Sequence, residues 1–410
     1  MRRLVIVGAS LAGLRAAQAA RKAGFDGELV MVGEERHLPY TRPPLSKELL
    51  AGEHTVDRVQ LPCDELGVEW RLGVPAVSLD RSRRRIVLAN GDEVEYDRVI
   101  LATGSRPRRW PGAGAELPGV HVLRDVDDSL ALRAAFDHRP RVAIVGAGFI
   151  GCEVAQTARK EDLEVALIDI AATPMLPLGP ELGAWCAELH RDNGVDLRLG
   201  TGVAELVGDG RAEAVELTSG ERVEADVVVV GLGALPNTEW LADSGLQVDS
   251  GLECDATLTA VGDPDILGAG DIVAWPHPLA DGETIRIEHW TVAAEQGQLA
   301  GRNAVLAAPD ERKPYVAPPY FWSDQYDVKI QSLGLPGRAE GVELLESTPD
   351  RSRMVYGAER DGRLVGIIAI NAARRLGSYR MALEDPPVFD ELRATVAADP
   401  GALGAPVGAA

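Results

Sequence analysis

The sequence predicts an α/β protein that contains two Rossmann-like dinucleotide-binding domains. A unit of strand, glycine-rich turn, helix and strand occurs twice in the chain, and an acidic residue follows each unit. The chain has 410 residues, which is more than one hydrophobic core normally serves, so we expect two or three domains. Apolar residues make up 46% of the chain and charged residues 26%, the balance of an ordinary globular enzyme.

The first unit begins at the start of the chain. Residues 4–7 are all apolar and predict a buried parallel strand, and a glycine-rich turn follows at residues 8–13. We expect a helix from this turn to about Lys22 and a second strand at residues 28–32. Glu34 then stands close behind the second strand.

The second unit repeats the same order of elements. Residues 142–145 predict the strand, residues 146–151 form the turn, and a helix then extends to about Glu161. The chain returns as a strand at residues 164–168, which ends on Asp169.

The spacing of small residues in both turns has a physical explanation. The first allows a tight turn, the second lets the backbone approach a pyrophosphate, and the third lets the helix pack against the strand. Free N–H groups and the helix dipole then attract the diphosphate, and the acid after the second strand accepts hydrogen bonds from an adenosine ribose. These positions are Gly8, Ser10 and Gly13 in the first turn, and Gly146, Gly148 and Gly151 in the second.

Two such sites indicate two dinucleotides. One chain that binds FAD and a nicotinamide cofactor is the simplest explanation, because a flavin is a redox relay. We expect FAD at the N-terminal site with Glu34 on its ribose, and the nicotinamide cofactor at the second site with Asp169 on its ribose. Ser10 departs from the pattern at the middle glycine, but a serine hydroxyl is small and can itself reach a phosphate. Asp169 is followed by Ile-Ala-Ala-Thr-Pro, without an arginine for a 2′-phosphate, so NADH is predicted over NADPH.

Further buried strands mark where the chain crosses between the two nucleotide-binding units. Residues 98–104 form a strand that ends in a small-residue turn, and residues 226–233 repeat this pattern. A third strand, residues 265–270, leads to Asp271, an acid that we expect to bind the flavin ribityl chain. The predicted domains are an FAD-binding domain in two parts, 1–107 and 236–315, an NADH-binding domain at 108–235, and a C-terminal domain at 316–410.

Composition argues against several classes of function. A net charge of −21 disfavours nucleic acid or an anionic membrane as the main partner. No segment approaches the roughly 18 consecutive apolar residues that span a bilayer. The apolar run at the N-terminus stops at a glycine turn, so we expect a cytoplasmic location. No metal-ligand spacing is found, and four scattered cysteines are predicted as core residues: Cys63, Cys152, Cys186 and Cys254.

Four segments outside the glycine turns carry a resemblance to a known family. They are Tyr40–Lys47 (YTRPPLSK), Gly151–Glu153 (GCE), Arg286–Trp290 (RIEHW) and Tyr320–Tyr326 (YFWSDQY). Together with the turns, they resemble the two-dinucleotide-binding-domain FAD oxidoreductases, which have a glutathione-reductase-like fold. Within that family the chain is similar to the oxygenase-coupled NADH-dependent ferredoxin reductases, the putidaredoxin reductase-like branch. The resemblance implies a small α+β C-terminal domain.

The resemblance also implies roles for individual residues. Lys47 would lie by the flavin N5 and pair with Glu153, so that a positive charge stabilises electron density there while the carboxylate orients the lysine. An ordinary salt bridge between domains is the alternative interpretation. Arg42 would contact the FAD diphosphate, and Trp322 would pack beside the flavin ring. Trp290 would begin a helix whose N-terminus stabilises negative charge at the flavin pyrimidine.

The turns, the crossing strands and the resemblance together predict the residues of the site. The catalytic pair is Lys47 with Glu153. Predicted FAD-binding residues are Gly8, Ser10, Gly13, Glu34, Arg42, Lys47, Ala102, Thr103, Gly104, Arg124, Asp271, Trp290 and Trp322. Predicted NADH-binding residues are Gly146, Gly148, Gly151, Glu153, Asp169 and Gly233.

The implied activity is that of an FAD-dependent NADH:ferredoxin reductase. It would take hydride from NADH onto FAD and pass single electrons to a [2Fe–2S] ferredoxin, which serves a cytochrome P450 or a Rieske-type oxygenase. Arg106 and Arg302 are candidates for contact with an acidic ferredoxin. We expect a monomer or a weak dimer.

Other functions on the same domain plan stay open. A rubredoxin reductase or a monodehydroascorbate reductase would share the enzyme class, whereas an apoptosis-inducing-factor-like flavoprotein would act as a switch that binds partners. Disulfide reductases need a cysteine pair on the flavin, and residues 42–47 contain no cysteine where that pair would lie. The small-residue tail from Val396 to Ala410 is expected to be disordered.

Overall fold

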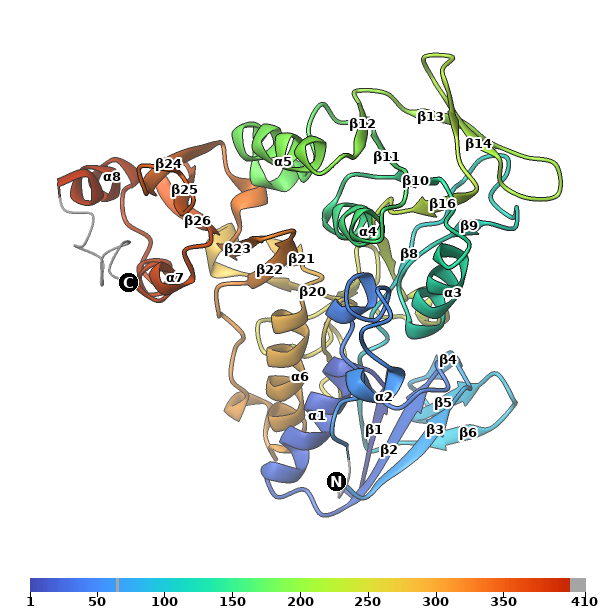
Figure 1. Ribbon diagram of the computed structural model, residues 1–410. Coiled ribbons are helices and arrows are strands. Elements are labelled where there is room, and N and C mark those ends of the chain that lie inside the picture. Colours follow the sequence, from blue (N-terminus) through green and yellow to red (C-terminus); the bar gives the residue numbers. More distant parts are fainter. Residues whose placement is uncertain (64–65, 399–410) are drawn as a thin grey trace. The chain divides into compact units, whose positions relative to one another are not determined.

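The computed structural model describes residues 1–63 and 66–398 of the chain (Figure 1). The chain divides into two compact units, which we call unit 1 and unit 2 and describe separately. Unit 1 comprises Met1–Thr41, Val59–Arg106 and Leu235–Tyr320, and unit 2 comprises Arg42–Arg58, Pro107–Ala234 and Phe321–Ala410.

Unit 1 contains a five-stranded parallel sheet with the strand order β19-β7-β1-β2-β3. Its inner strands are apolar and buried on both faces, as is typical of a parallel sheet covered by helices. The five strands are β1 (Arg3–Val7), β2 (Glu28–Gly33), β3 (Val68–Leu72), β7 (Arg98–Leu101) and β19 (Ile266–Gly268).

Helices α1 (Leu11–Lys22) and α6 (Trp290–Val305) lie side by side in unit 1 (Figure 1). They approach closely because α6 presents glycine at two contact positions. A Cβ atom on Gly297 would lie only 2.3 Å from the carbonyl oxygen of Ala12, and Gly301 meets the next turn of α1 in the same way. Helix α6 is therefore fixed against the helix that follows the first glycine turn.

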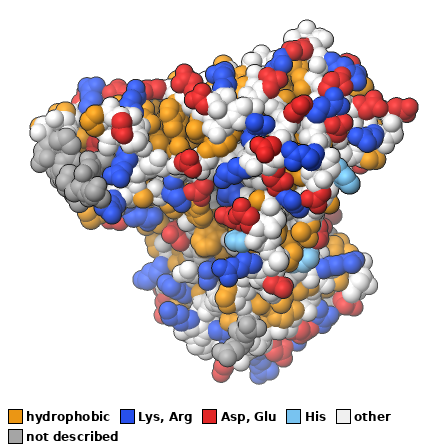
Figure 2. All heavy atoms as spheres, in the orientation of Figure 1, with side chains coloured by type: hydrophobic (Ala, Val, Ile, Leu, Met, Phe, Trp, Pro, Cys, Tyr) orange, Lys and Arg blue, Asp and Glu red, His pale blue; other side chains and the backbone are white. Residues whose placement is uncertain are grey.

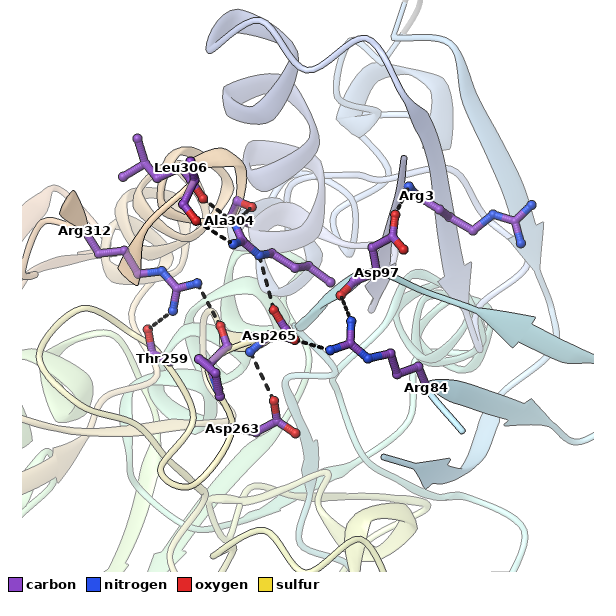
Figure 3. Close-up of polar contacts among 12 residues, drawn as sticks. Arg3, Arg84, Asp97, Thr259, Asp263, Asp265, Ala304, Leu306 and Arg312 are labelled. Carbon is purple, nitrogen blue, oxygen red and sulfur yellow. Dashed lines mark hydrogen bonds and ion pairs between the residues drawn. The ribbon is translucent and has the colours of Figure 1, made fainter. Parts of the chain in front are cut away.

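Arg98 connects the carboxyl end of α6 to the amino ends of two sheet strands. Its Nη1 donates to the carbonyl oxygens of Ala304, at 2.7 Å, and of Leu306, both at the end of the helix. Its Nε lies 3.5 Å from Asp265, which also pairs with Arg84 (Figure 3). A guanidinium at this position satisfies the last carbonyl groups of α6 and complements the negative end of the helix dipole.

The remaining strands of unit 1 form two small sheets. One is antiparallel and the other is mixed, with β18 parallel and β21 antiparallel to β20. The strands are β4 (Ala76–Asp80), β5 (Arg85–Leu88) and β6 (Glu93–Glu95) in the first, and β18 (Leu252–Glu253), β20 (Val273–Pro276) and β21 (Thr284–Arg286) in the second. Three short elements lie where the chain passes between the units: α2 (Val56–Val59), β8 (Ser105–Pro107) and β17 (Ala234–Pro236).

Unit 2 contains a second parallel sheet, with the order β12-β11-β10-β16-β9. Its strands are β9 (Val120–His121), β10 (Val142–Val145), β11 (Val165–Asp169), β12 (Asp196–Leu199) and β16 (Val227–Val230). Its helices are α3 (Val126–Phe136), α4 (Phe149–Lys160) and α5 (Pro180–Asp192). A small antiparallel sheet follows, made of β13 (Val203–Val207), β14 (Ala214–Leu217) and β15 (Arg222–Glu224).

The C-terminal part of unit 2 is an α+β structure, as the resemblance implied. Its sheet has the order β22-β23-β26-β25-β24, and one buried core continues from Ile144 and Leu167 of the parallel sheet to Ile330 and Ile368 of this one. The strands are β22 (Tyr320–Gln325), β23 (Val328–Gly334), β24 (Gly341–Ser347), β25 (Met354–Arg360) and β26 (Arg363–Ile370). Helices α7 (Leu376–Ala382) and α8 (Phe389–Ala398) follow.

The predicted strand–turn–helix–strand units are confirmed, with helix and strand ends within two residues of the expected positions. The disordered tail was predicted to begin at Val396, which is too early, because α8 continues to Ala398. The rest of the predicted tail lies outside the described residues. Three cysteines are buried as predicted, whereas Cys63 is partly exposed. Within residues 1–63 and 66–398 we find no helix long and apolar enough to cross a bilayer, and no cluster of side chains suited to a metal ion.

The segment Arg42–Arg58 packs within unit 2, although sequence reasoning placed it in the first part of the FAD-binding domain. The carbonyl oxygen of Leu45 accepts from Ser129 at 2.7 Å, and that of Ser46 accepts from Thr157 at 2.7 Å. These bonds join the segment to α3 and α4. The assignment of domains to particular ligands stays a prediction.

Arg375 and Glu346 form a buried ion pair in the C-terminal part of unit 2. Their side chains are only 2% and 3% exposed, and Nη2 of Arg375 lies 2.8 Å from Oε1 of Glu346. The hydroxyl of Tyr379 donates to the same oxygen at 2.6 Å. Neither charge can be rehydrated if its partner is removed.

We therefore expect Arg375→Met to lower the free energy of unfolding by about 3–5 kcal/mol, because it leaves the Glu346 carboxylate buried and unpaired. Urea unfolding followed by circular dichroism measures this loss. The control is Arg374→Met, since Arg374 is the preceding residue and is exposed. Equal unfolding midpoints for the two variants would contradict the prediction.

Candidate functional site

The first glycine turn, in unit 1, brings the backbone of two strands into close contact. Gly8 has a φ of +120°, and a Cβ atom there would lie 2.0 Å from the carbonyl oxygen of Ala102. A Cβ atom on Gly13 would lie 2.0 Å from the carbonyl oxygen of Gly8. Ser10 is the N-cap of α1 but makes no capping hydrogen bond with its side chain. A helix start without a side-chain cap is suited to an anionic diphosphate, because its free N–H groups can donate to phosphate oxygens.

Other predicted FAD residues of unit 1 gather at the same edge of the sheet. Ala102 follows β7, and its N–H donates to the carbonyl oxygen of Val7 at 2.7 Å. Thr103 donates to the carbonyl oxygen of Asn237 at 2.9 Å, and Gly104 has a φ of +68°. Glu34 lies exposed just past the end of β2, the strand beside β1.

Asp271 follows strand β19 in the chain and is held in place by hydrogen bonds. Its Oδ2 accepts from the hydroxyl of Ser105 at 3.0 Å, and its carbonyl oxygen accepts from Arg286 at 3.0 Å. In the adjacent residue, the N–H of Gly270 donates to Oε1 of Gln296 at 2.9 Å. The buried Nε2 of that glutamine has no hydrogen-bond partner within the part of the chain that the structure describes.

Trp290 begins helix α6, as predicted. Its indole N–H donates to the hydroxyl of Thr41 at 3.2 Å. The N-cap residue His289 makes no capping bond with its side chain, and burial lowers the pKa of His289 to about 4, so the ring is neutral at neutral pH. The neutral ring of His289 adds no positive charge at the start of α6, so the helix dipole alone would attract a negative charge there.

The second glycine turn, in unit 2, repeats the geometry of the first. Gly146 has a φ of +109°, and its Cβ atom would lie 2.3 Å from the carbonyl oxygen of Gly231. The Cβ atom of Gly151 would lie 2.0 Å from the carbonyl oxygen of Gly146. Gly148, in contrast, is exposed, and no atom lies within 4 Å of its Cβ position. The outer glycines are needed by the fold, whereas the middle one leaves space for a ligand.

Asp169 lies at the end of β11, beside this turn. Its two carboxylate oxygens accept from the N–H groups of Ala147, at 2.6 Å, and Ala171, at 2.8 Å. Gly233 lies exposed beyond β16 with a φ of +83°, at the same edge of the sheet. Open space at Gly148 next to an oriented carboxylate fits the adenosine half of a dinucleotide.

Lys47 and Glu153 form a buried ion pair in unit 2. Nζ of Lys47 lies 2.6 Å from Oε2 of Glu153, and their side chains are 13% and 6% exposed. Lys47 follows the short helix η1 (Pro43–Ser46), and Ser46 donates its hydroxyl to the same oxygen at 2.6 Å. The predicted contact between the two charged residues is confirmed, and the low exposure makes it a stronger interaction than a surface salt bridge.

Three further predicted residues lie in the same unit. Nη1 of Arg42 donates to the carbonyl oxygen of Arg124 at 2.6 Å, so the structure brings these two arginines together. Trp322 is partly exposed on β22, and the next residue, Ser323, donates to Oε1 of Glu153 at 2.6 Å.

Sequence reasoning missed Ser46 and Ser323, the two hydroxyl groups that hold Glu153. Both lie inside segments that carry the family resemblance, and this was the signal in the sequence that could have pointed to them.

The predicted residues fall into two groups, one for each unit. Unit 1 holds Gly8, Ser10, Gly13, Glu34, Ala102, Thr103, Gly104, Asp271 and Trp290, and unit 2 holds Arg42, Lys47, Arg124, Gly146, Gly148, Gly151, Glu153, Asp169, Gly233 and Trp322.

Comparison with known proteins agrees with this geometry. Residues 2–297 match the family described as pyridine nucleotide-disulphide oxidoreductase, and residues 320–402 match the reductase C-terminal family. The chain is 38% identical to the ferredoxin–NAD(+) reductase component of the anthranilate 1,2-dioxygenase system of Burkholderia cepacia over 393 residues, which cover 93% of this chain and 95% of the relative. It is 35% identical to rhodocoxin reductase of Rhodococcus erythropolis over 399 residues, which cover 94% and 92%.

A solved structure is similar over the same extent. The covalent putidaredoxin reductase–putidaredoxin complex matches with a TM-score of 0.87 and 30% identity, over 94% of this chain and 93% of that chain.

We expect Gly148→Ala to fold normally and to weaken NADH binding, because its methyl group would occupy space next to the helix N-terminus and touch nothing in the protein. The Michaelis constant for NADH should rise roughly ten-fold, while the melting temperature stays unchanged. Gly146→Ala is the contrasting variant, since its Cβ meets backbone and should lower the melting temperature. If Gly148→Ala melts early, the middle glycine serves the fold and not the ligand.

Proposed function

Because this chain belongs to the pyridine nucleotide-disulphide oxidoreductase family, we propose that it is the ferredoxin reductase of an oxygenase system. It is an NADH-dependent flavoprotein oxidoreductase with FAD and NADH as its cofactors. In the proposed reaction it takes hydride from NADH and passes single electrons to a [2Fe–2S] ferredoxin, which serves a cytochrome P450 or a Rieske-type oxygenase. The names of its relatives, which include a dioxygenase component and rhodocoxin reductase, support this assignment.

The buried Lys47–Glu153 pair is the observation that carries the proposal. Bound FAD supplies the conversion between electron pairs from a nicotinamide and single electrons for an iron–sulfur cluster. Lys47 supplies a fixed positive charge, which stabilises electron density that arrives beside it. Glu153 holds the ammonium group through a 2.6 Å contact, so no reorganisation is needed when charge develops.

The second glycine turn and Asp169 would bind and orient NADH. The uncapped start of α4 faces the space at Gly148, where a diphosphate would be attracted by free N–H groups. Asp169 would accept from the adenosine ribose and would repel a 2′-phosphate. Glu34 would bind the corresponding ribose of FAD, Arg42 would contact its diphosphate, and Trp322 would pack beside its ring. Arg124 is proposed as a further FAD-binding residue.

Two other classes of function share this architecture. A rubredoxin reductase or monodehydroascorbate reductase would differ only in the electron acceptor. A flavoprotein switch would keep its reduced flavin for long periods and bind partners in that state. The rate at which a one-electron acceptor reoxidises the protein separates the reductases from the switch.

The first test is anaerobic stopped-flow absorbance of the protein mixed with NADH and then with a [2Fe–2S] ferredoxin. We expect fast loss of the flavin absorbance, followed by recovery that depends on the ferredoxin. Absence of bleaching would overturn the NADH assignment. If the flavin bleaches and only another one-electron acceptor restores its absorbance, the protein is a different reductase. If no one-electron acceptor restores the absorbance, the result favours the switch.

Glu153→Gln should slow flavin reduction by NADH roughly 100-fold, because the ammonium group of Lys47 loses the charge that orients it. Glu161→Gln is the matched control, since Glu161 pairs with Arg133 elsewhere in unit 2. Both rates come from single-turnover absorbance measurements. A similar slowing in the two variants would mean that the Lys47 pair has only a structural role.

Arg302 is the better of the two predicted candidates for a ferredoxin contact. Arg106 pairs with Glu239 and also donates to the side chain of Asn237 at 3.2 Å, so its charge is already engaged. Arg302 is exposed on α6. Basic and acidic side chains are interspersed on the face drawn in Figure 2, so isolated arginines are available to an acidic partner despite the net charge of −21.

Arg302→Ala should raise the Michaelis constant for the ferredoxin several-fold and leave flavin reduction by NADH unchanged, because an exposed charge acts on encounter with the partner. Steady-state ferredoxin reduction at two ionic strengths measures the effect, which should shrink at high salt. The control is Arg83→Ala, an exposed arginine that pairs loosely with Asp80 at 3.8 Å. Equal slowing of flavin reduction and ferredoxin reduction would exclude a docking role for Arg302.

A further inference from the structure

The carboxylate of Glu153 accepts hydrogen bonds at both of its oxygens. Oε2 accepts from Lys47 and Ser46, and Oε1 accepts from Ser323 at 2.6 Å. Ser323 lies on β22, 170 residues further along the chain, and is only 1% exposed. A hydrogen bond to a charged group is strongest where water is excluded, so Ser323 contributes to the position of the carboxylate as directly as the lysine does.

Three more side chains continue from Ser323 in the direction away from Glu153. Nε2 of Gln325 lies 3.2 Å from Oγ of Ser323, and Oε1 of Gln325 lies 3.0 Å from Nε2 of His190. The hydroxyl of Tyr326 lies 3.2 Å from Nδ1 of the same histidine. Gln325 and His190 are fully buried, so water does not replace a missing partner for either of them.

Donors and acceptors in this row can be assigned in only one way. The carboxylate is an acceptor, so the single hydroxyl proton of Ser323 points to it, and Ser323 must accept from the amide NH₂ of Gln325. The amide oxygen of Gln325 is then left to accept from the Nε2–H of His190. Nδ1 of a neutral His190 is the remaining acceptor, and the hydroxyl of Tyr326 donates to it.

The charge states of the two outer groups agree with this assignment. Burial lowers the pKa of His190 to about 4, so its ring carries one proton at neutral pH. Burial also raises the pKa of Tyr326, so the phenol keeps the proton that it donates. The rings of these two residues also pack edge to face, with centroids 5.3 Å apart.

We propose that these four side chains form a one-directional hydrogen-bond chain, which we call the carboxylate chain, and that it holds Glu153 in position for Lys47. The inference rests on the proposed role of the Lys47–Glu153 pair and extends that role to positioning residues on other elements. The carboxylate chain consists of Ser323, Gln325, His190 and Tyr326.

The direction of the donors decides what the carboxylate chain does. Each donor points toward Glu153, so the dipoles align and each bond strengthens the next. The amide of Gln325 exchanges its protons poorly compared with a hydroxyl or an imidazole, so the chain orients a charge and does not relay a proton. Tyr326 holds this geometry from a turn between β22 and β23 where its φ is +54°, a conformation that only strong tertiary contacts sustain in a tyrosine.

The first test is the tautomer of His190 in the oxidised FAD-bound protein labelled with ¹⁵N-histidine. Nitrogen chemical shifts distinguish a ring with its proton on Nε2 from one with its proton on Nδ1, and the His190→Gln variant assigns the signal. We expect the Nε2–H tautomer, neutral at pH 6 and above. The Nδ1–H tautomer, or a ring that is protonated at pH 6, would overturn the proposal.

The second test uses Ser323→Ala, with Ser332→Ala as the matched control, since Ser332 is a buried serine on the neighbouring strand β23. In Ser323→Ala the amide of Gln325 loses its acceptor, so the histidine signal should show both tautomers although residue 323 does not touch the ring. Flavin reduction at saturating NADH should slow roughly ten-fold, the loss expected for one charge-assisted hydrogen bond, with an unchanged Michaelis constant for NADH. Ser323→Thr keeps the hydroxyl and should restore both readouts.

The outcomes separate this inference from the function on which it rests. If Glu153→Gln slows flavin reduction but Ser323→Ala leaves both the rate and the histidine tautomer unchanged, the pair acts in catalysis and the carboxylate chain does not position it. If Glu153→Gln has no effect, the proposed function of the pair fails, whatever tautomer His190 adopts.

Discussion

The buried ion pair between Lys47 and Glu153 is the constraint on which the candidate site depends. A charge that is removed from water is tolerated only when a partner and further hydrogen bonds replace the lost hydration. Glu153 meets this requirement with three donors from two segments: Ser46 and Lys47 at the end of η1, and Ser323 on the strand β22. The pair therefore ties a short N-terminal segment and the C-terminal sheet to helix α4, and this explains why both pack within unit 2.

The glycine turns impose a second constraint, which is steric. In both turns the first and third glycines lie within about 2 Å of a backbone oxygen at the Cβ position, so no side chain fits there. Helices α1, α4 and α6 all begin without a side-chain cap, although helix starts usually recruit one. Uncapped N–H groups are a cost to the free protein that a phosphate or a reduced ring can offset.

Much of this arrangement could be predicted from local patterns. Apolar runs of four residues predicted β1 and β10 because a strand buried on both faces needs continuous apolar side chains, and the glycine spacing predicted the turns after them. Helix α6 begins at Trp290 as expected. The contact between Lys47 and Glu153 came from family resemblance, since nothing in the local sequence joins residues 106 positions apart.

The sequence by itself determined the two nucleotide-binding units, their order in the chain and the residues of the glycine turns, because apolar runs and glycine spacing are patterns within short stretches of the chain. Only the tertiary structure decided that residues 42–58 pack with unit 2, that Arg106 is engaged by Glu239, and that two serines hold the carboxylate of Glu153. Hydrogen-bond partners such as His190 and Gln325 are 135 residues apart. Each lies on the buried face of its own element, but that periodicity does not indicate which partner it meets. A polar side chain in a strand or helix shows its role only when the fold buries it and a particular partner has to satisfy it.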